Sequence, residues 1–223
     1  MAAKTDPRAQ PRAPLNRERV LRAAVALADT GGIESLTMRK LGQELRVEAM
    51  SLYNHVASKD DILDGIVDHV FSEIVVPSDR ADWKAAMRER AISARQVLLR
   101  HRWAIGLMDS RVTPGPATLR HHDAVIGSLR EAGFSIGMAA HAYSVMDSYI
   151  YGFALQQTTL AIDTSKDPAE MAEAFRNHLP ANEYPHLSEM VDHATKPGYD
   201  FAEEFAFGLD LILAGLERLR QKA

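Results

Sequence analysis

Between Ser35 and Lys59 a tight turn separates two short apolar patterns, and the second carries small and polar side chains where a core helix would carry large aliphatic ones. Small residues let a helix backbone approach base edges in the major groove of DNA, and asparagine can pair with adenine. Ala49 and Ser51 are small, and Asn54 supplies the amide. This pattern predicts binding to double-stranded DNA.

Each candidate DNA contact follows from its side-chain chemistry. Met50 can touch a thymine methyl group, whereas Tyr53, His55 and Lys59 can reach phosphate oxygens. Thr37 is expected to cap the first helix of the pair, because its hydroxyl can accept a backbone N–H of the first turn. The predicted DNA-binding residues are Thr37, Met38, Arg39, Ala49, Met50, Ser51, Tyr53, Asn54, His55 and Lys59.

Helices must position these residues, and apolar spacing predicts an all-α fold. The helical pair covers residues 37–45 and 48–54, and a helix over 16–30 precedes it. A linking helix over 59–76 is expected to start at a Ser58 cap and to end at Pro77. Further helices are predicted over 83–101, 115–132, 135–160, 168–178, 186–195 and 201–220.

The charge of the chain is unevenly distributed. Residues 1–60 hold ten Lys and Arg against seven Asp and Glu, a net +3, so the remainder must carry −7 to give the total of −4. A basic head can neutralise phosphates while an acidic body stays away from DNA. We expect a basic arm over 1–14, a helix-turn-helix domain over 15–60 and a larger helical domain over 61–223. The arm either follows a DNA groove or is a solvated tail.

Composition excludes several other classes. The absence of cysteine excludes a disulfide scaffold and a cysteine metal cluster. The first fifteen residues contain no apolar stretch, so no secretion signal is expected. The most apolar segment, 136–155, carries His141 and Asp147, which argues against a membrane span. A cytoplasmic location without a cofactor is expected.

Residues Arg17 to Val70 resemble the DNA-binding domain of the TetR family of bacterial repressors. The most specific part is the Leu52-Tyr53-x-His55-Val56 run followed by Lys59. Other matching positions are Ala23, Ala24, Leu27, Gly31, Gly32, Leu36, Thr37, Met38, Arg39, Leu41 and Leu63. The stretch from Tyr184 to Leu219 is similar to the C-terminal part of the tetracycline-repressor subgroup. The resemblance implies a homodimer on a palindromic operator, released when a small-molecule effector binds the larger domain.

Polar residues within apolar stretches indicate where an effector would bind. The predicted contacts are Met87, Arg90, Ile105, Met108, His122, Met146, Asp147 and Tyr151. Methionine adapts its shape, so this set favours a flat or hydrophobic molecule. Positions that bind magnesium-tetracycline in the family correspond to Val75, Arg90, Ala94 and Met108, which makes tetracycline an unexpected ligand. Arg90 either attracts an anionic or carbonyl-bearing ligand or pairs with a nearby acid.

Two long helices, 135–160 and 201–220, are too apolar for an ordinary surface helix. In the family the corresponding helices form an intersubunit four-helix bundle. The predicted interface residues are Phe205, Leu209, Ile212 and Leu216. The alternative is that both helices are core helices of a monomer.

The head departs from the family pattern at Arg46, where relatives usually have glycine in a left-handed conformation. That conformation costs other residues about 1 kcal/mol. Two other functions remain open: a constitutive DNA-binding protein without an effector, and a helical metalloenzyme. No H-E-x-x-H motif occurs, and the adjacent His121 and His122 would point about 100° apart on a helix. No catalytic or metal-ligating residue is therefore predicted.

Overall fold

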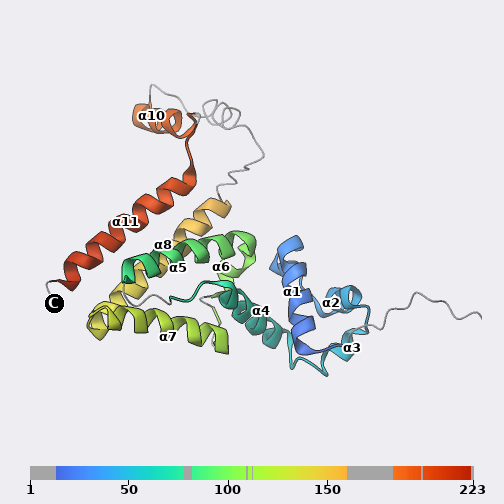
Figure 1. The fold of residues 1–223 in the computed structure, drawn as a ribbon. Helices are drawn as coiled ribbons and strands as arrows, with labels where there is room; N and C mark the ends of the chain where they lie inside the picture. The colour runs from blue at the N-terminus through green and yellow to red at the C-terminus, as the bar shows by residue number, and fades with distance from the viewer. Residues whose placement is uncertain are drawn as a thin grey trace, which may run out of the picture. The chain divides into compact units, whose positions relative to one another are not determined.

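A computed structural model of the chain describes residues 14–77, 82–108, 110–111, 113–159, 183–196 and 198–221 (Figure 1). These residues form α-helices and two short 3-10 helices, and no strand occurs among them. The predicted all-α class is confirmed. The chain divides into two compact units, Met1–Ile74 with Arg100–His121, and Val75–Leu99 with His122–Ala223. None of the described helices has the length and hydropathy needed to cross a membrane.

The first unit begins with α1 (Arg17–Gly31), α2 (Met38–Leu45), α3 (Ala49–Leu52) and α4 (Lys59–Glu73). A core of fully buried side chains holds them together: Val20, Ala24, Leu41, Leu52, Ile66 and Val70. Side-chain caps start three of these helices, because Asn16, Thr37 and Ser58 each accept a backbone N–H of the following first turn. The predicted caps at Thr37 and Ser58 are confirmed.

The first unit also contains the 3-10 helices Ile33–Ser35 and Arg102–Ala104, the short helix α6 (Ile105–Met108) and the start of α7 (Pro116–Glu131). The helical turns over 102–108 were not predicted from the sequence. They are too short for an apolar period to be recognised, since a periodic pattern needs about 11 to 18 residues. We call the stretch from Arg100 to Arg111 the α6 segment.

The second unit contains α5 (Trp83–Arg100), the remainder of α7, α8 (Ile136–Thr159), α10 (Pro185–Ala194) and α11 (Phe201–Arg220). Helices α8 and α11 lie side by side (Figure 1). Between them Tyr149 stacks on Phe205 and donates its hydroxyl to the Phe205 carbonyl at 3.0 Å. The indole of Trp83 donates to Glu217 at 3.0 Å and so joins α5 to α11.

The linking helix is shorter than predicted, because α4 ends at Glu73 and not at residue 76. Ile74 has an extended backbone, and its N–H donates to the Phe71 carbonyl. Three β-branched residues follow Glu73, which lowers helix propensity, and the last of them precedes Pro77, a position that disfavours helical geometry. The predicted helix over 168–178 lies outside the described residues, as does the predicted arm over 1–14 except for its last residue.

Candidate functional site

The turn between α2 and α3 brings the two helices very close. A Cβ on Gly42 would lie 2.8 Å from the Val47 carbonyl oxygen, so only glycine fits there without a shift of the backbone. Arg46 has φ 57° and ψ 45°, which is left-handed geometry. It is the one non-glycine residue of the described chain with a positive φ, as the sequence analysis expected. The turn is therefore that of a helix-turn-helix, with an arginine where glycine would relieve strain.

The ten predicted DNA-binding residues lie at the start of α2, on α3, in the turn that follows α3 and at the start of α4, and none of them is buried. Helix α3 is a single turn, shorter than the predicted 48–54, and its only buried side chain is Leu52. Met50 is 75% exposed and Tyr53 46% exposed. Asn54 is also exposed, whereas Ala49 and Ser51 are partly covered. The surface opposite Leu52 thus presents an apolar, an aromatic and an amide side chain.

Asp61 fixes the loop that joins α3 to α4. Its two carboxylate oxygens accept hydrogen bonds from Arg17 of α1 at 2.7 Å and from the Ala57 backbone at 2.9 Å. The Arg17 hydrogen bond, helped by the Ala57 N–H, lowers the pKa of Asp61 below its usual value. Lys59 is exposed at the first position of α4. The loop that carries Tyr53 and Asn54 is therefore anchored, and a cation stands at its end.

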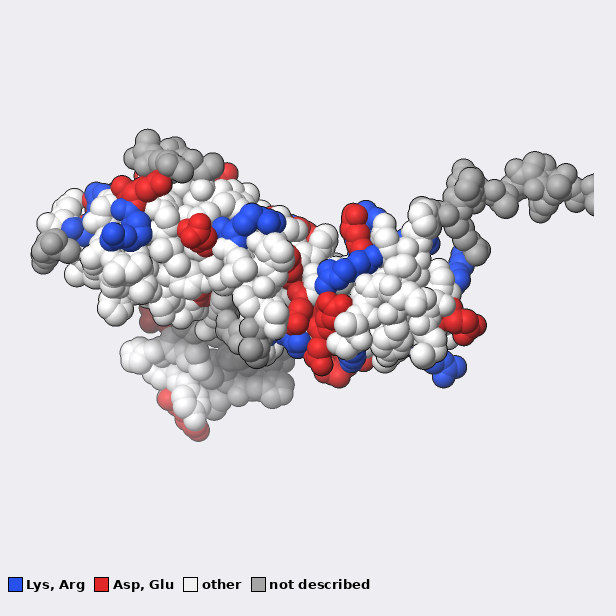
Figure 2. All heavy atoms as spheres, turned by 90° about the horizontal axis from the view of Figure 1, so that it is seen from below, with Lys and Arg blue, Asp and Glu red and all other residues white. Residues whose placement is uncertain are grey.

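Many surface charges of the described chain are paired. Arg22 and Glu18 lie one helical turn apart on α1, and Arg88 of α5 pairs with Asp210 of α11. Figure 2 shows basic and acidic side chains next to one another on the face that it draws. The face that Figure 2 draws therefore has no continuous basic field.

The second unit has a buried polar cluster on α5, α7 and α8. Arg90 pairs with Asp147 at 2.5 Å, and the guanidinium lies over the Tyr143 ring at 5.9 Å from its centre. The Tyr151 hydroxyl lies 3.5 Å from the second Asp147 oxygen, and the His122 ring contacts Tyr143 edge to face. We call these five residues the Arg90 cluster. Of the two alternatives for Arg90, pairing with an acid is the one observed.

Burial lowers the pKa of His122 below its usual value, an effect that the nearby Asp147 opposes and Arg90 reinforces. A neutral imidazole can both donate and accept a hydrogen bond. Two further predicted effector contacts, Met87 and Met146, are fully buried in the second unit. The remaining two, Ile105 and Met108, are half-buried on α6 of the first unit.

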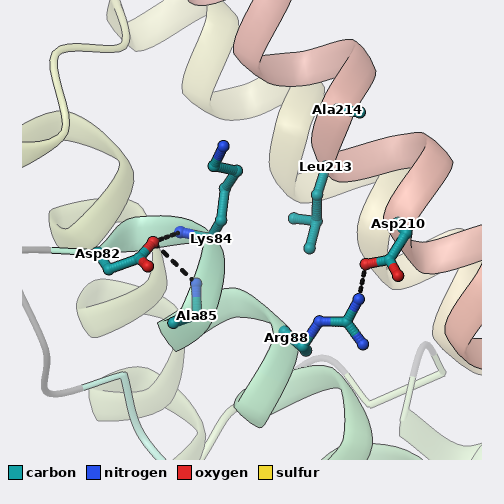
Figure 3. Close-up of a pocket in the computed structure, with 7 residues that line it drawn as sticks. All are labelled: Asp82, Lys84, Ala85, Arg88, Asp210, Leu213 and Ala214. Carbon is teal, nitrogen blue, oxygen red and sulfur yellow. Dashed lines mark hydrogen bonds and ion pairs between the residues drawn. The ribbon is translucent and has the colours of Figure 1, made fainter.

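A surface hollow of about 390 Å³ lies between the start of α5 and α11 (Figure 3). At its edge Asp82 accepts the backbone N–H groups of Lys84 and Ala85, and so caps α5. The ion pair between Arg88 and Asp210 closes one side. None of the residues predicted to bind the effector lines this hollow, so the hollow is separate from the predicted effector site.

The four residues predicted for a dimer interface lie mostly inside their own protomer. Phe205, Leu209 and Leu216 are buried, and Ile212 is partly exposed. The exposed large apolar side chains of α8 and α11 are Ile136, Val145, Leu155, Phe207, Leu211 and Leu219. The exposed apolar side chains of α11 therefore lie on another face of the helix than the buried Phe205, Leu209 and Leu216.

One polar cluster of the first unit was not predicted. His101 is buried, with Nδ1 2.8 Å from Asp29 of α1 and Nε2 3.3 Å from Glu73 of α4. The indole of Trp103 donates to the same Asp29 oxygen at 2.7 Å, and Arg100 donates to Glu73 at 2.6 Å. We call these five residues the His101 cluster. His101 and Asp29 are 72 positions apart, so no local pattern signals their contact.

The chain matches two family models. The model of bacterial regulatory proteins of the tetR family covers residues 20–66, and that of the tetracyclin repressor-like C-terminal domain covers residues 76–220. The HTH-type transcriptional repressor DrrR1 of Streptomyces coeruleorubidus is 31% identical over 218 residues, which is 94% of this chain and 80% of that protein. The class D tetracycline repressor of Escherichia coli is 31% identical over 210 residues, 91% of this chain and 89% of that protein.

Among solved structures, ActR of Streptomyces coelicolor in complex with actinorhodin superimposes with a TM-score of 0.74. It is 30% identical, and the match covers 93% of this chain and 99% of ActR. The family models and these relatives describe transcriptional regulators and not enzymes, which removes the metalloenzyme alternative.

Proposed function

Because this chain belongs to the TetR family of DNA-binding transcriptional regulators, we propose that it is a cytoplasmic repressor that binds a palindromic operator as a homodimer and is released by a small-molecule effector. Residues 15–60 form its DNA-binding domain, and residues 61–223 its effector-binding and dimerisation domain. The observation that carries the proposal is the tight α2–α3 turn, which exposes Met50, Tyr53 and Asn54 opposite buried Leu52.

The exposed side chains make two kinds of DNA contact, to base edges and to phosphates. Met50 and Asn54 contact base edges in the major groove, since an apolar side chain fits a thymine methyl and an amide fits adenine. Tyr53, His55 and Lys59 contact phosphates and fix the register of α3 on the duplex. The anchored Asp61 keeps the loop in the geometry that these contacts need.

The effector binds beside the Arg90 cluster in the second unit. The complex of the relative ActR with actinorhodin supports a small-molecule ligand for this chain. Met87 and Met146 supply an adaptable apolar surface, while His122 and Tyr151 supply hydrogen bonds. Arg90 is balanced by Asp147, so a strongly anionic ligand is not needed to neutralise it. A typical coupling of about 1–3 kcal/mol would weaken operator binding about 5- to 150-fold.

Selection of bound duplexes from a random DNA pool tests the proposal. We expect a two-fold symmetric motif, and we expect Tyr53→Ala and Asn54→Ala each to weaken binding to it by about tenfold. Gln96→Ala, at an exposed position of α5, is the matched control and should bind as the parent does. Enrichment of no motif would refute operator binding. If flat aromatic compounds never weaken binding to the motif, the protein is a constitutive DNA-binding protein without an effector.

A further inference from the structure

The His101 cluster joins three elements of the first unit at one side chain. Asp29 comes from the last turns of α1, Glu73 from the end of α4, and His101 itself from the α6 segment. By contrast Arg111, at the other end of the α6 segment, contacts only α4 among these helices, through Asp60 and Asp64. His101 is therefore the one residue of the cluster that contacts both α1 and α4, whereas Trp103 reaches only α1, through Asp29, and Arg100 reaches only α4, through Glu73.

The geometry of His101 depends on its protonation. Both ring nitrogens face a carboxylate oxygen, at 2.8 Å for Asp29 and 3.3 Å for Glu73. A neutral imidazole has one N–H and can donate to only one of them, so its other nitrogen would present a lone pair to a carboxylate. The imidazolium ion has two N–H groups and can donate to both. The observed contacts are thus complete only in the protonated form.

The charges around the His101 ring are also balanced when the ring is protonated. Glu73 pairs with Arg100 at 2.6 Å, and His69 of α4 lies 3.5 Å from its other oxygen. Arg102 lies near Asp29, because both line a second surface hollow together with Trp103. The carboxylate of Asp29 accepts hydrogen bonds from His101 and from the neutral Trp103 indole. A proton on His101 balances the Asp29 charge inside the cluster.

We propose that His101, as an imidazolium, is a positioning residue that couples the α6 segment to α1 and α4, and that operator affinity follows its protonation. This inference rests on the proposed function. With the cluster closed, α1 is held to the end of α4, and a pre-organised head loses less conformational freedom when it binds DNA. Loss of the proton removes one of the two hydrogen bonds of His101, while Trp103 and Arg100 keep theirs to the same carboxylates, and the weaker link lowers operator affinity. Histidine is the side chain whose charge ordinarily changes between about pH 5 and 8.

The test measures the affinity of the full chain for the selected operator duplex by fluorescence anisotropy, at about pH 6 and pH 8.5 and constant ionic strength. We expect the parent to bind about five- to tenfold more weakly at the higher pH. The variant His101→Gln should bind the operator weakly at both pH values, so its affinity should not change between them. His55, at the DNA surface, can add a pH response of its own, so the difference between the parent and His101→Gln is the quantity that decides.

Three further variants locate the effect. Asp29→Asn keeps an acceptor for Trp103 but removes the charge that faces His101, so it should lose most of the same pH response. Asp64→Asn removes the carboxylate charge that faces Arg111 at the other end of the α6 segment, and this variant should keep the pH response. His69→Gln should also keep the pH response, which would exclude His69, the other histidine beside Glu73, as its source. An equal pH response in the parent, His101→Gln and Asp29→Asn would overturn the proposal.

A second measurement does not require an operator. Amide hydrogen exchange of the free protein should show the last turns of α1 better protected in the parent than in His101→Gln at about pH 6, and equally protected at pH 8.5. Equal protection at both pH values would refute the coupling. If no duplex is bound but this difference is seen, the operator proposal fails while the His101 link stands.

Discussion

Arg90 of α5 and Asp147 of α8 form an ion pair at 2.5 Å in which the arginine side chain is only 1% exposed. Removing two charges from water is costly, and their attraction offsets this cost only while both partners are present. The pair therefore holds α5 and α8 in register at the point where the effector is proposed to bind. A ligand that displaced either group would have to replace its partner.

Replacement of Arg90 by Met should lower the free energy of unfolding by about 3–5 kcal/mol, because it leaves the Asp147 charge buried and unbalanced. The double variant Arg90→Met with Asp147→Leu should recover most of that loss. Equilibrium urea unfolding of the three proteins measures both effects. Equal stability of the single variant and the parent would show that Asp147 is not charged in the folded protein.

Arg46→Gly should raise the free energy of unfolding by about 0.5–1 kcal/mol, since glycine adopts the left-handed conformation without steric cost. The matched control is Glu44→Gly, which places glycine within α2 and should lower stability by about 1 kcal/mol. Thermal unfolding compares the two variants. A loss of stability in Arg46→Gly would mean that the arginine side chain makes a contact that outweighs the backbone strain.

Local rules account for the features that the sequence predicted well. Local sequence is enough to predict the caps at Thr37 and Ser58 and the left-handed backbone of Arg46, because each depends on neighbours within a few residues. The long apolar stripe of α11 likewise predicted a helix over 201–220, the range observed. Phe205 and Leu209 lie on that stripe, but they are buried within the chain itself, whereas the sequence predicted them for a dimer interface.

Features that depend on distant partners were not predictable in this way. Which apolar face of α11 is covered by its own protomer depends on α8, and the stripe alone does not say whether the covering helix belongs to the same chain. The His101 cluster joins residues from α1, α4 and the α6 segment, and no periodicity connects them. The early end of α4 reflects the low helix propensity of the β-branched residues before Pro77, to which the position of the proline alone gives no clue.

Stability should fall when the pH is lowered from about 5 to 3.5. The Arg17 hydrogen bond lowers the pKa of Asp61, and although burial opposes it, hydrogen bonds from Arg100 and His101 lower the pKa of Glu73. As the pH falls, Asp61 and Glu73 are therefore protonated at a higher pH in the unfolded chain than in the folded one. The stabilisation that both carboxylates give above their unfolded-state pKa values is then lost. Urea unfolding at several pH values measures the loss, which should be smaller in Asp61→Asn. An identical loss in that variant would contradict the assignment.

Paired substitution of Phe207 and Leu211 by Ser should convert the proposed dimer to a monomer without unfolding it, because both side chains are exposed on α11. Phe205→Ala should instead reduce stability by about 3–5 kcal/mol, since its ring is buried within the protomer. Light scattering after gel filtration reports the oligomeric state, and circular dichroism reports the fold. A parent that is monomeric at micromolar concentration would refute the dimer.

The brevity of α3 limits how much of the genome this protein can distinguish. If Met50 and Asn54 each specified one base pair in both half-sites, a matching sequence would recur by chance about every 260 base pairs, far too often among about a million or more competing sites. Part of the information must then be carried by base pairs that no side chain touches, through the energy needed to bend or twist them. Substitutions between the half-sites should consequently alter affinity although they remove no contact.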